Sequence, residues 1–297
     1  MYRRILVPLD GSELAETALD YARDIVGRLN LSMTVLHVYD SAEQEFITMR
    51  EGYIAGIVDL VRHQLSEQFG RGHGLPEEVQ GKLAMGHAAE EIIHYADKND
   101  IDLILMATHG RSGIKRWAIG SIADKVVRAT KKPVILIRAA KAAPPQNVII
   151  VPLDGFKQSE AVVGYIESLA SGLKSDVVLL RVLEEYYEID TRRGMTRVRY
   201  TNARMEQLKE EANRYLDKIA TPLRDSGITV KSEVRIGEIA REIIKLADEE
   251  NARMVAMLKR RRSSISPLDL GSVADKVLRR GTTPVLLFST SGSSQKR

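Results

Sequence analysis

The chain has 297 residues, of which 44% are hydrophobic and 28% charged, and its formal net charge is +4. This length predicts two domains, and the composition is that of a folded globular protein rather than a disordered one. The sequence contains no cysteine, which excludes disulfides, thiolate catalysis and cysteine-based metal sites.

Neither a membrane span nor secretion is expected from this sequence. No apolar run approaches the roughly 18 residues that a membrane helix requires. The N-terminal sequence MYRRILVPLDG enters a strand without a secretory hydrophobic region, so we expect a cytoplasmic protein. The net charge is small for this length, and Lys and Arg are interspersed with Asp and Glu, so nucleic acid is not an expected partner.

Strands and helices alternate through the first half of the chain. Residues 4–9 (RILVPL) form an apolar run suited to a buried parallel strand, and Ser12 begins an amphipathic helix that ends near Leu29. Further strands are predicted at 33–39, 79–85, 103–106 and 133–138, and further helices within 40–72, at 88–98 and from Gly120 towards Lys131. This alternation predicts an α/β fold with a doubly wound parallel sheet.

The second half of the chain repeats the first. VPLDG at 7–11 returns 144 residues later, and GSIADKVVR at 120–128 returns 151 residues later as GSVADKVLR. The second copy therefore carries about seven additional residues, which fall at 184–200, where we expect a mobile loop. The predicted organisation is a domain at 1–139, a linker at 140–146, a second domain at 147–290 and a flexible tail at 291–297.

The stretch 103–128 contains the clearest indication of a ligand. It is predicted to run from an apolar strand through a loop with Gly110 and Gly113 to a helix that begins at Gly120 and Ser121. The first turn of such a helix presents backbone N–H groups at the positive end of the helix dipole, where phosphate oxygens bind. The spacing matches neither the Walker A nor the dinucleotide pattern. By itself it is equally compatible with a phosphate site and with an ordinary glycine turn.

Three motifs in this order resemble the universal stress protein family: VPLDGS at 7–12, LHV at 36–38 and MATHGRSGIKRWAIGS at 106–121. The phosphate motif of that family is Gly-x2-Gly-x9-Gly-Ser/Thr, and the resemblance covers nearly the whole chain, twice over. It implies a tandem universal stress protein. Such a protein would have two flavodoxin-like, five-stranded parallel sheets, similar to those of adenine-nucleotide α-hydrolases, with the ligand where the strand order reverses.

The resemblance also implies which residues hold ATP, together with magnesium or manganese, in the first domain. Asp10 would contact the adenosine moiety, and Val38 would meet the adenine through its backbone. Met106 and Ala107 would lie by the ribose. The remaining contacts would come from Pro8, Leu9, Gly110, Gly120, Ser121, Ile122 and Ala123. We add Arg111, because a guanidinium beside Gly110 reaches phosphates through charge-assisted hydrogen bonds.

Both copies depart from the family motif. Ala107 stands where the motif has glycine, which is obstructive if that position needs a positive φ or a close approach of the ligand and harmless if it only ends a strand. In the second copy the loop reads LKRRRSS at 258–264, and bulky Leu258 and Arg261 are expected to close or reshape the cradle. Its four cations at 259–262 are expected to form a solvated basic loop, with anion or RNA binding as the alternative.

No residue is assigned a catalytic role. His37 is expected to be structural. Asp10 is the carboxylate placed at a strand end beside the predicted phosphate loop, but hydrolysis would also need a positioned base and transition-state cations, for which only Arg111, Lys115 and Arg116 are near. Binding without fast turnover therefore fits the sequence better.

We predict an ATP-binding signalling module of the stress response, with slow or no hydrolysis. A nucleotide-free interaction scaffold is one alternative. An ATP-using enzyme of a related fold is another, although Leu9-Asp10-Gly11-Ser12 replaces the Ser-Gly-Gly-x-Asp-Ser loop of adenylating ATP pyrophosphatases. The apolar ends of the copies, PVILIR at 133–138 and PVLLF at 284–288, are predicted to pair within one chain. A homodimer and an unknown protein partner are left open.

Overall fold

The structure, a computed structural model, describes residues 2–70, 78–108, 119–138, 146–191, 194–259 and 270–289, without the side chains of 42–44 and 187–197. The chain forms two compact units. Unit 1 comprises Met1–Ala142, Lys259–Gly271 and Pro284–Arg297, and unit 2 comprises Ala143–Leu258 and Ser272–Thr283. Unit 1 contains two segments from the second copy of the repeat, so the two units do not coincide with the two copies. The domain boundaries expected from the repeat therefore stay a prediction.

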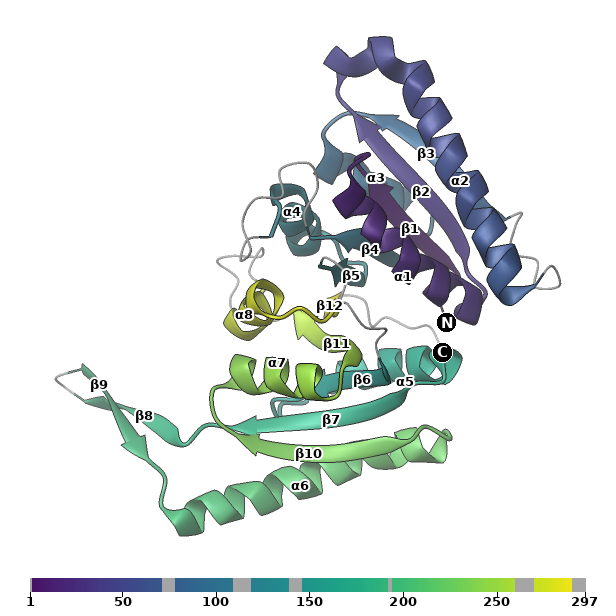
Figure 1. Cartoon of the computed structure of the whole chain (residues 1–297). Helices are drawn as coiled ribbons and strands as arrows, with labels where there is room; N and C mark the ends of the chain where they lie inside the picture. The colour runs from purple at the N-terminus through teal and green to yellow at the C-terminus, as the bar shows by residue number, and fades with distance from the viewer. Residues whose placement is uncertain are drawn as a thin grey trace. The chain divides into compact units, whose positions relative to one another are not determined.

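Unit 1 alternates strands and helices from its first residues (Figure 1). In chain order the elements are β1 (Arg4–Leu9), α1 (Glu13–Leu29), β2 (Ser32–Tyr39), the 3-10 helix η1 (Ser41–Phe46), α2 (Ile47–Phe69), β3 (Val79–Met85), α3 (Ala88–Lys98), β4 (Leu103–Ala107), α4 (Ser121–Ala129) and β5 (Val134–Ile137). The strand order is β3-β2-β1-β4-β5, and all of these strands run parallel. The order reverses between β1 and β4, which is where ligands bind in open α/β sheets.

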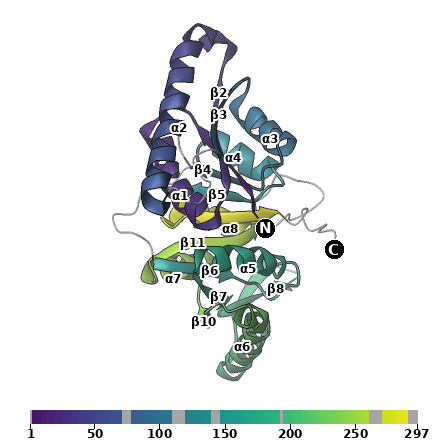
Figure 2. The same cartoon turned by 90° about the vertical axis from the view of Figure 1, so that its right-hand side faces the viewer.

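Helices cover both faces of the unit 1 sheet. Helices α1 and α2 lie on one face, and α3 and α4 lie on the other (Figure 2). The central strand β1 is therefore apolar on both sides, and its residues Ile5, Leu6 and Val7 are fully buried. This is why the sequence of β1 reads as a continuous apolar run rather than an alternating one.

Unit 2 repeats this arrangement. Its elements are β6 (Gln146–Pro152), α5 (Ala161–Leu173), β7 (Asp176–Leu183), β8 (Tyr186–Thr191), β9 (Gly194–Arg199), α6 (Asn202–Asp225), β10 (Val230–Ile236), α7 (Ile239–Glu249), β11 (Ala252–Lys259) and α8 (Ser272–Arg280). The order β10-β7-β6-β11 is parallel and matches β3-β2-β1-β4. Even the backbone repeats, since φ is 80° at Gly11 and 82° at Gly155. The predicted tandem α/β fold with doubly wound parallel sheets is confirmed.

The last strand, β12 (Val285–Ser289), belongs to unit 1. It pairs antiparallel with β5, so that Val285 lies opposite Leu136 and Leu287 opposite Val134. This is the predicted pairing of the two terminal strands within one chain. It also means that the sheet in unit 1 is not wholly parallel, because the pairing covers the outer edge of β5 with a strand of opposite direction.

The seven-residue surplus of the second copy is not the mobile loop that we expected. Residues 186–191 and 194–199 form two antiparallel strands, β8 and β9, which pair from Tyr186 opposite Arg199 to Thr191 opposite Gly194. Aromatic and β-branched residues favour this extended conformation. Among the helices that the structure describes, none is both long and apolar enough to span a bilayer.

Two helical glycines of unit 1 provide a matched test of the packing between α1 and α2. Alanine is favoured over glycine inside a helix by about 0.5–1 kcal/mol. At Gly56 in α2, no described atom beyond the chain neighbours and the backbone of α2 lies within 4 Å of an added Cβ, whereas at Gly27 in α1 the Cβ would lie 2.1 Å from the Phe69 ring. We expect Gly56→Ala to raise the free energy of unfolding by that amount and Gly27→Ala to lower it, because the ring must move.

Urea denaturation of both variants and the unchanged chain measures these differences. Equal stabilisation by the two substitutions would show that Phe69 does not pack against α1 as described.

Candidate functional site

The turn after β1 fixes a carboxylate at the end of the strand. The Asp10 Oδ1 atom accepts hydrogen bonds from the backbone N–H and the hydroxyl of Ser12, at 3.0 and 2.6 Å. The Ser12 Oγ atom in turn accepts from the Ala15 N–H at 3.1 Å and caps α1. Because Gly11 has a φ of 80°, the chain can turn sharply between them. The start of α1 thus holds Asp10 in place.

The start of helix α4 differs from that of α1. The Gly120 N–H donates to the Thr108 carbonyl at 2.7 Å, and the Gly120 carbonyl accepts from the Asp124 N–H at 2.9 Å, which starts the helix. Within the described part of the chain, no side chain caps its N-terminus. The Asp124 carboxylate, the acidic group of the first turn, pairs with Arg128 at 2.8 Å. The first-turn N–H groups of Ser121 and Ile122 are therefore available to an anion.

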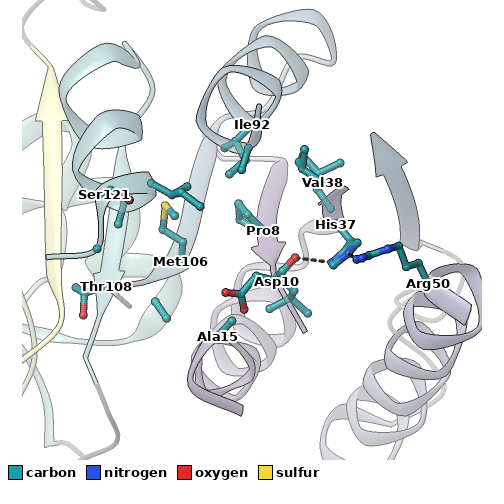
Figure 3. A pocket seen from close by; sticks show the side chains of 17 residues that line it. Pro8, Asp10, Ala15, His37, Val38, Arg50, Ile92, Met106, Thr108 and Ser121 are labelled. Carbon is teal, nitrogen blue, oxygen red and sulfur yellow. Dashed lines mark hydrogen bonds between the residues drawn. The ribbon is translucent and has the colours of Figure 1, made fainter. Parts of the chain in front are cut away.

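A cavity of about 300 Å³ lies between these two features, at the carboxyl ends of β1, β2 and β4 (Figure 3). Ten of the twelve residues predicted to contact ATP line it: Pro8, Leu9, Asp10, Val38, Met106, Ala107, Gly120, Ser121, Ile122 and Ala123. The other two, Gly110 and Arg111, lie outside the described residues. The structure thus brings the predicted residues together around one cavity, while their role in binding is a proposal.

The chemistry of the wall changes along the cavity. Figure 3 shows Ser121 and Met106 at one end, Asp10 in the middle, and His37 and Arg50 at the other end. Asp10 is the one carboxylate, and Arg50 the one guanidinium, among the described lining residues, and most of the others are apolar. Such a wall suits a ligand with an anionic group, an apolar ring and a few hydrogen-bonding atoms.

Sequence reasoning missed seven residues of this wall: Ala15, Leu36, His37, Arg50, Ala88, Ile92 and Thr108. His37 was expected to be structural, and it is buried with its Nδ1 atom 2.9 Å from the Leu9 carbonyl oxygen, yet it also lines the cavity. Arg50 precedes the buried Ile54 by four residues, which places both on one face of α2. This spacing in the sequence is the pattern from which the inward position of Arg50 could have been predicted.

The departure at Ala107 does not obstruct the backbone. Ala107 ends β4, pairs with Ile137 in the parallel register and does not have a positive φ. A required positive φ at this position is therefore wrong, whereas a close approach of the ligand to Ala107 is not tested and the harmless reading stays a prediction.

The second copy differs at the equivalent positions. Arg181 takes the place of His37 and donates from Nη1 to the Leu153 carbonyl at 3.4 Å, where His37 contacts Leu9. Phe156 takes the place of Ser12 and is 59% exposed. Asp154 keeps its turn, since its Oδ1 atom accepts from the Phe156 N–H at 2.9 Å.

Lys259 corrects our expectation of a solvated basic loop at 259–262. It is buried, and its ammonium group donates to the carbonyls of Val127 and Thr130 at 2.9 and 3.1 Å. Lysine at this place satisfies carbonyls that the end of α4 leaves without intrahelical donors. Lys259 is therefore not available to RNA or to a free anion, and the other three cations lie outside the described residues.

Comparison with known proteins agrees with the fold and the duplication. The model of the universal stress protein family matches residues 1–138 and again residues 147–289. Universal stress protein MJ0531 of Methanocaldococcus jannaschii is 27% identical over 146 residues, which cover 48% of this chain and 85% of that protein. Universal stress protein YxiE of Bacillus subtilis is 26% identical over 153 residues, covering 46% of this chain and 100% of that protein.

A solved structure extends the likeness to the whole fold. The crystal structure of a universal stress protein from Archaeoglobus fulgidus covers 97% of this chain and 98% of its own, with a TM-score of 0.70 and 19% sequence identity. That structure supports the fold, and the family model, which matches both copies, supports the relationship. The chain belongs to the universal stress protein family.

Proposed function

We propose that unit 1 binds ATP and that the protein acts as a nucleotide-dependent signalling module of the stress response, with slow or no ATP hydrolysis. One observation carries the proposal: one cavity joins the N-terminus of α4, which no described side chain caps, to the fixed carboxylate of Asp10. The phosphates of an adenine nucleotide can accept hydrogen bonds from the N-terminus of α4, and its ribose hydroxyls can donate to Asp10.

The polyphosphate would lie at the start of α4. Backbone N–H groups at Ser121, Ile122 and Ala123 offer hydrogen bonds there, at the positive end of the helix dipole. Ribose hydroxyls would donate to Asp10, whose carboxylate is oriented by Ser12. The base would lie between apolar side chains such as Val38 and Ile92. The cavity volume falls at the lower end of the roughly 300–1,000 Å³ of small-ligand sites.

Slow turnover is part of the proposal because few of the described lining residues are charged. Hydrolysis would need a positioned base and cations that stabilise the transition state. Among the described lining residues Asp10 is the one carboxylate, and Arg50 lies at the end away from α4 (Figure 3). The described residues contain no cluster of three or more candidate metal ligands. A magnesium or manganese ion would take ligands from the phosphates and from Asp10, the carboxylate among the described lining residues.

The second copy is proposed to bind no ATP, so that each chain holds one nucleotide. It lacks the leading glycines of the phosphate motif, and Arg181 and Phe156 replace His37 and Ser12 beside the equivalent carboxylate. A homodimer and a protein partner that reads the bound state stay predictions.

The first residues of α4 and α8 allow this asymmetry to be tested. Ser121 and Ser272 are both exposed and occupy the same position in the two copies. Glutamate in the first turn of a helix is favourable, so neither substitution is expected to unfold the protein. We expect Ser121→Glu to weaken ATP binding at least about tenfold by repulsion of the phosphates, and Ser272→Glu to leave it unchanged.

Isothermal titration calorimetry of the full chain with ATP measures both affinity and stoichiometry. One site that is weakened only by Ser121→Glu supports the proposal. Two equal sites, or equal effects of the two substitutions, would contradict it.

A further inference from the structure

We propose that the outer edge of β3 is a dimer interface, at which β3 pairs antiparallel with β3 of a second chain. Leu83 lies opposite Leu83 of the second chain in this dimer, and Met85 fills a groove between α2 and β3. The groove shares no lining residue with the cavity of the proposed function, so this inference goes beyond that function. It is supported by the open edge of β3, the groove beside it and an exposed methionine at its end.

Strand β3 is the outer strand of the unit 1 sheet. It pairs with β2 from Met33 opposite Val79 to Tyr39 opposite Met85, and it pairs with no other strand in the part of the chain that the structure describes. At the opposite edge of this sheet, β5 is covered by β12. The outer side of β3 therefore has backbone N–H and C=O groups without a strand partner among the described residues, and such an edge can pair with another chain.

The outer strand of unit 2 is protected in a way that β3 is not. In β10, Lys231 and Arg235 each pair with Glu233, at 2.9 and 2.6 Å, so charged side chains line that strand. Charged residues of this kind oppose association at the edge of a sheet. Strand β3 contains one charged residue, Lys82, and is therefore the less protected of the two edges.

A groove of about 400 Å³ lies between α2 and β3, which are neighbours in Figure 1. Ile54, Ala55 and Val58 of α2 supply its apolar part, and Gly81 and Leu83 of β3 also line it. A Cβ atom at Gly81 would lie 2.2 Å from the Ile54 side chain. Glycine at this position therefore allows α2 to lie close to the strand, and the groove opens beside it.

The exposed methionine lies on the same face of β3 as the groove. Side chains alternate along a strand, so Gly81, Leu83 and Met85 share one face. The closeness of Gly81 to Ile54 identifies this as the face that α2 covers. Met85 is 53% exposed, although it is apolar. Methionine adapts its shape to irregular gaps, which suits a side chain that enters a groove.

These positions select one register for antiparallel pairing. With Leu83 opposite Leu83 of the second chain, Met85 lies opposite Gly81, which has no side chain beside the groove. Each methionine then enters the groove of the other chain, as two-fold symmetry requires. Lys82 lies opposite Ala84, so the two ammonium groups are kept apart. A register centred on Lys82 would place like charges directly opposite each other.

The charges of the groove are balanced, which suits self-association. Its lining contains two carboxylates, Glu51 and Asp59, and two cations, Arg62 and Lys82. A two-fold axis brings a surface against itself, so a surface of one charge sign would repel a second chain. The fold already pairs equivalent strands at the opposite edge, where β5 and β12 of the two copies run antiparallel. Both features favour a second chain over an unrelated peptide as the occupant.

The absence of cysteine allows the register to be tested by cross-linking. In Leu83→Cys the two thiols of a dimer lie opposite each other, with Cα atoms about 4.5–5.5 Å apart, which a disulfide can span. In Lys82→Cys they are diagonal neighbours with Cα atoms about 7–8 Å apart, which is beyond that range. After mild oxidation of the full chain, we expect a covalent dimer of Leu83→Cys and little of Lys82→Cys on non-reducing electrophoresis.

Sedimentation equilibrium of Met85→Glu tests the contact with the groove. Met85 is exposed, so the substitution is not expected to unfold the chain. In the dimer, each new carboxylate would lose water among Ile54, Ala55 and Val58 of the other chain, and we expect the dimer Kd to rise at least about hundredfold. Met49→Glu is the matched control and should leave the Kd unchanged, because Met49 is 66% exposed on α2 and does not line the groove.

Several results would overturn this inference. The unchanged chain could stay monomeric at millimolar concentration, or it could form a dimer that Met85→Glu leaves intact or that Met49→Glu weakens equally. Cross-linking of Lys82→Cys as strong as that of Leu83→Cys would contradict the register. None of these results affects the proposed ATP site, since nucleotide binding is measured separately by calorimetry.

Discussion

The candidate site depends on the two ends of one short helix. The first turn of α4 has N–H groups without intrahelical acceptors, and Gly120 supplies no side chain to cap them. At the other end, Lys259 donates to the carbonyls of Val127 and Thr130, so the ammonium charge lies at the negative end of the helix dipole. The helix is therefore anchored at its C-terminus while its N-terminus faces the cavity.

The two copies contribute differently to the candidate site and to the helix that forms it. Lys259 and β12 both come from the sequence of the second copy, but both belong to unit 1, where Lys259 binds the end of α4 and β12 pairs with β5. Unit 2 keeps the fold of unit 1, down to the turn at Asp154, but Arg181 and Phe156 stand where unit 1 has His37 and Ser12. These differences fit the proposal that the second copy has lost its ligand site. The second copy still has a structural role, because it supplies Lys259 and β12 to unit 1.

The sequence predicted the regular elements more closely than the contacts between them. The bounds of β1, β3 and α3 are those expected, because apolar runs with clear flanking turns define them. The partners of Lys259 lie 132 and 129 residues away, so no local pattern could reveal its burial. The paired strands β8 and β9 were missed because they lie in an insertion without a counterpart in the first copy. Spacing placed Arg50 on the inner face of α2 but could not show that this face closes a cavity.

The central claim is that backbone N–H groups of α4 bind the phosphates of ATP. It is tested most directly by following the amide resonances of Ser121, Ile122 and Ala123 by NMR in the full chain, during titration with ATP and, separately, with adenosine. We expect large shifts of these three resonances with ATP and small shifts with adenosine. Equal shifts with both ligands, or none with ATP at millimolar concentration, would contradict it.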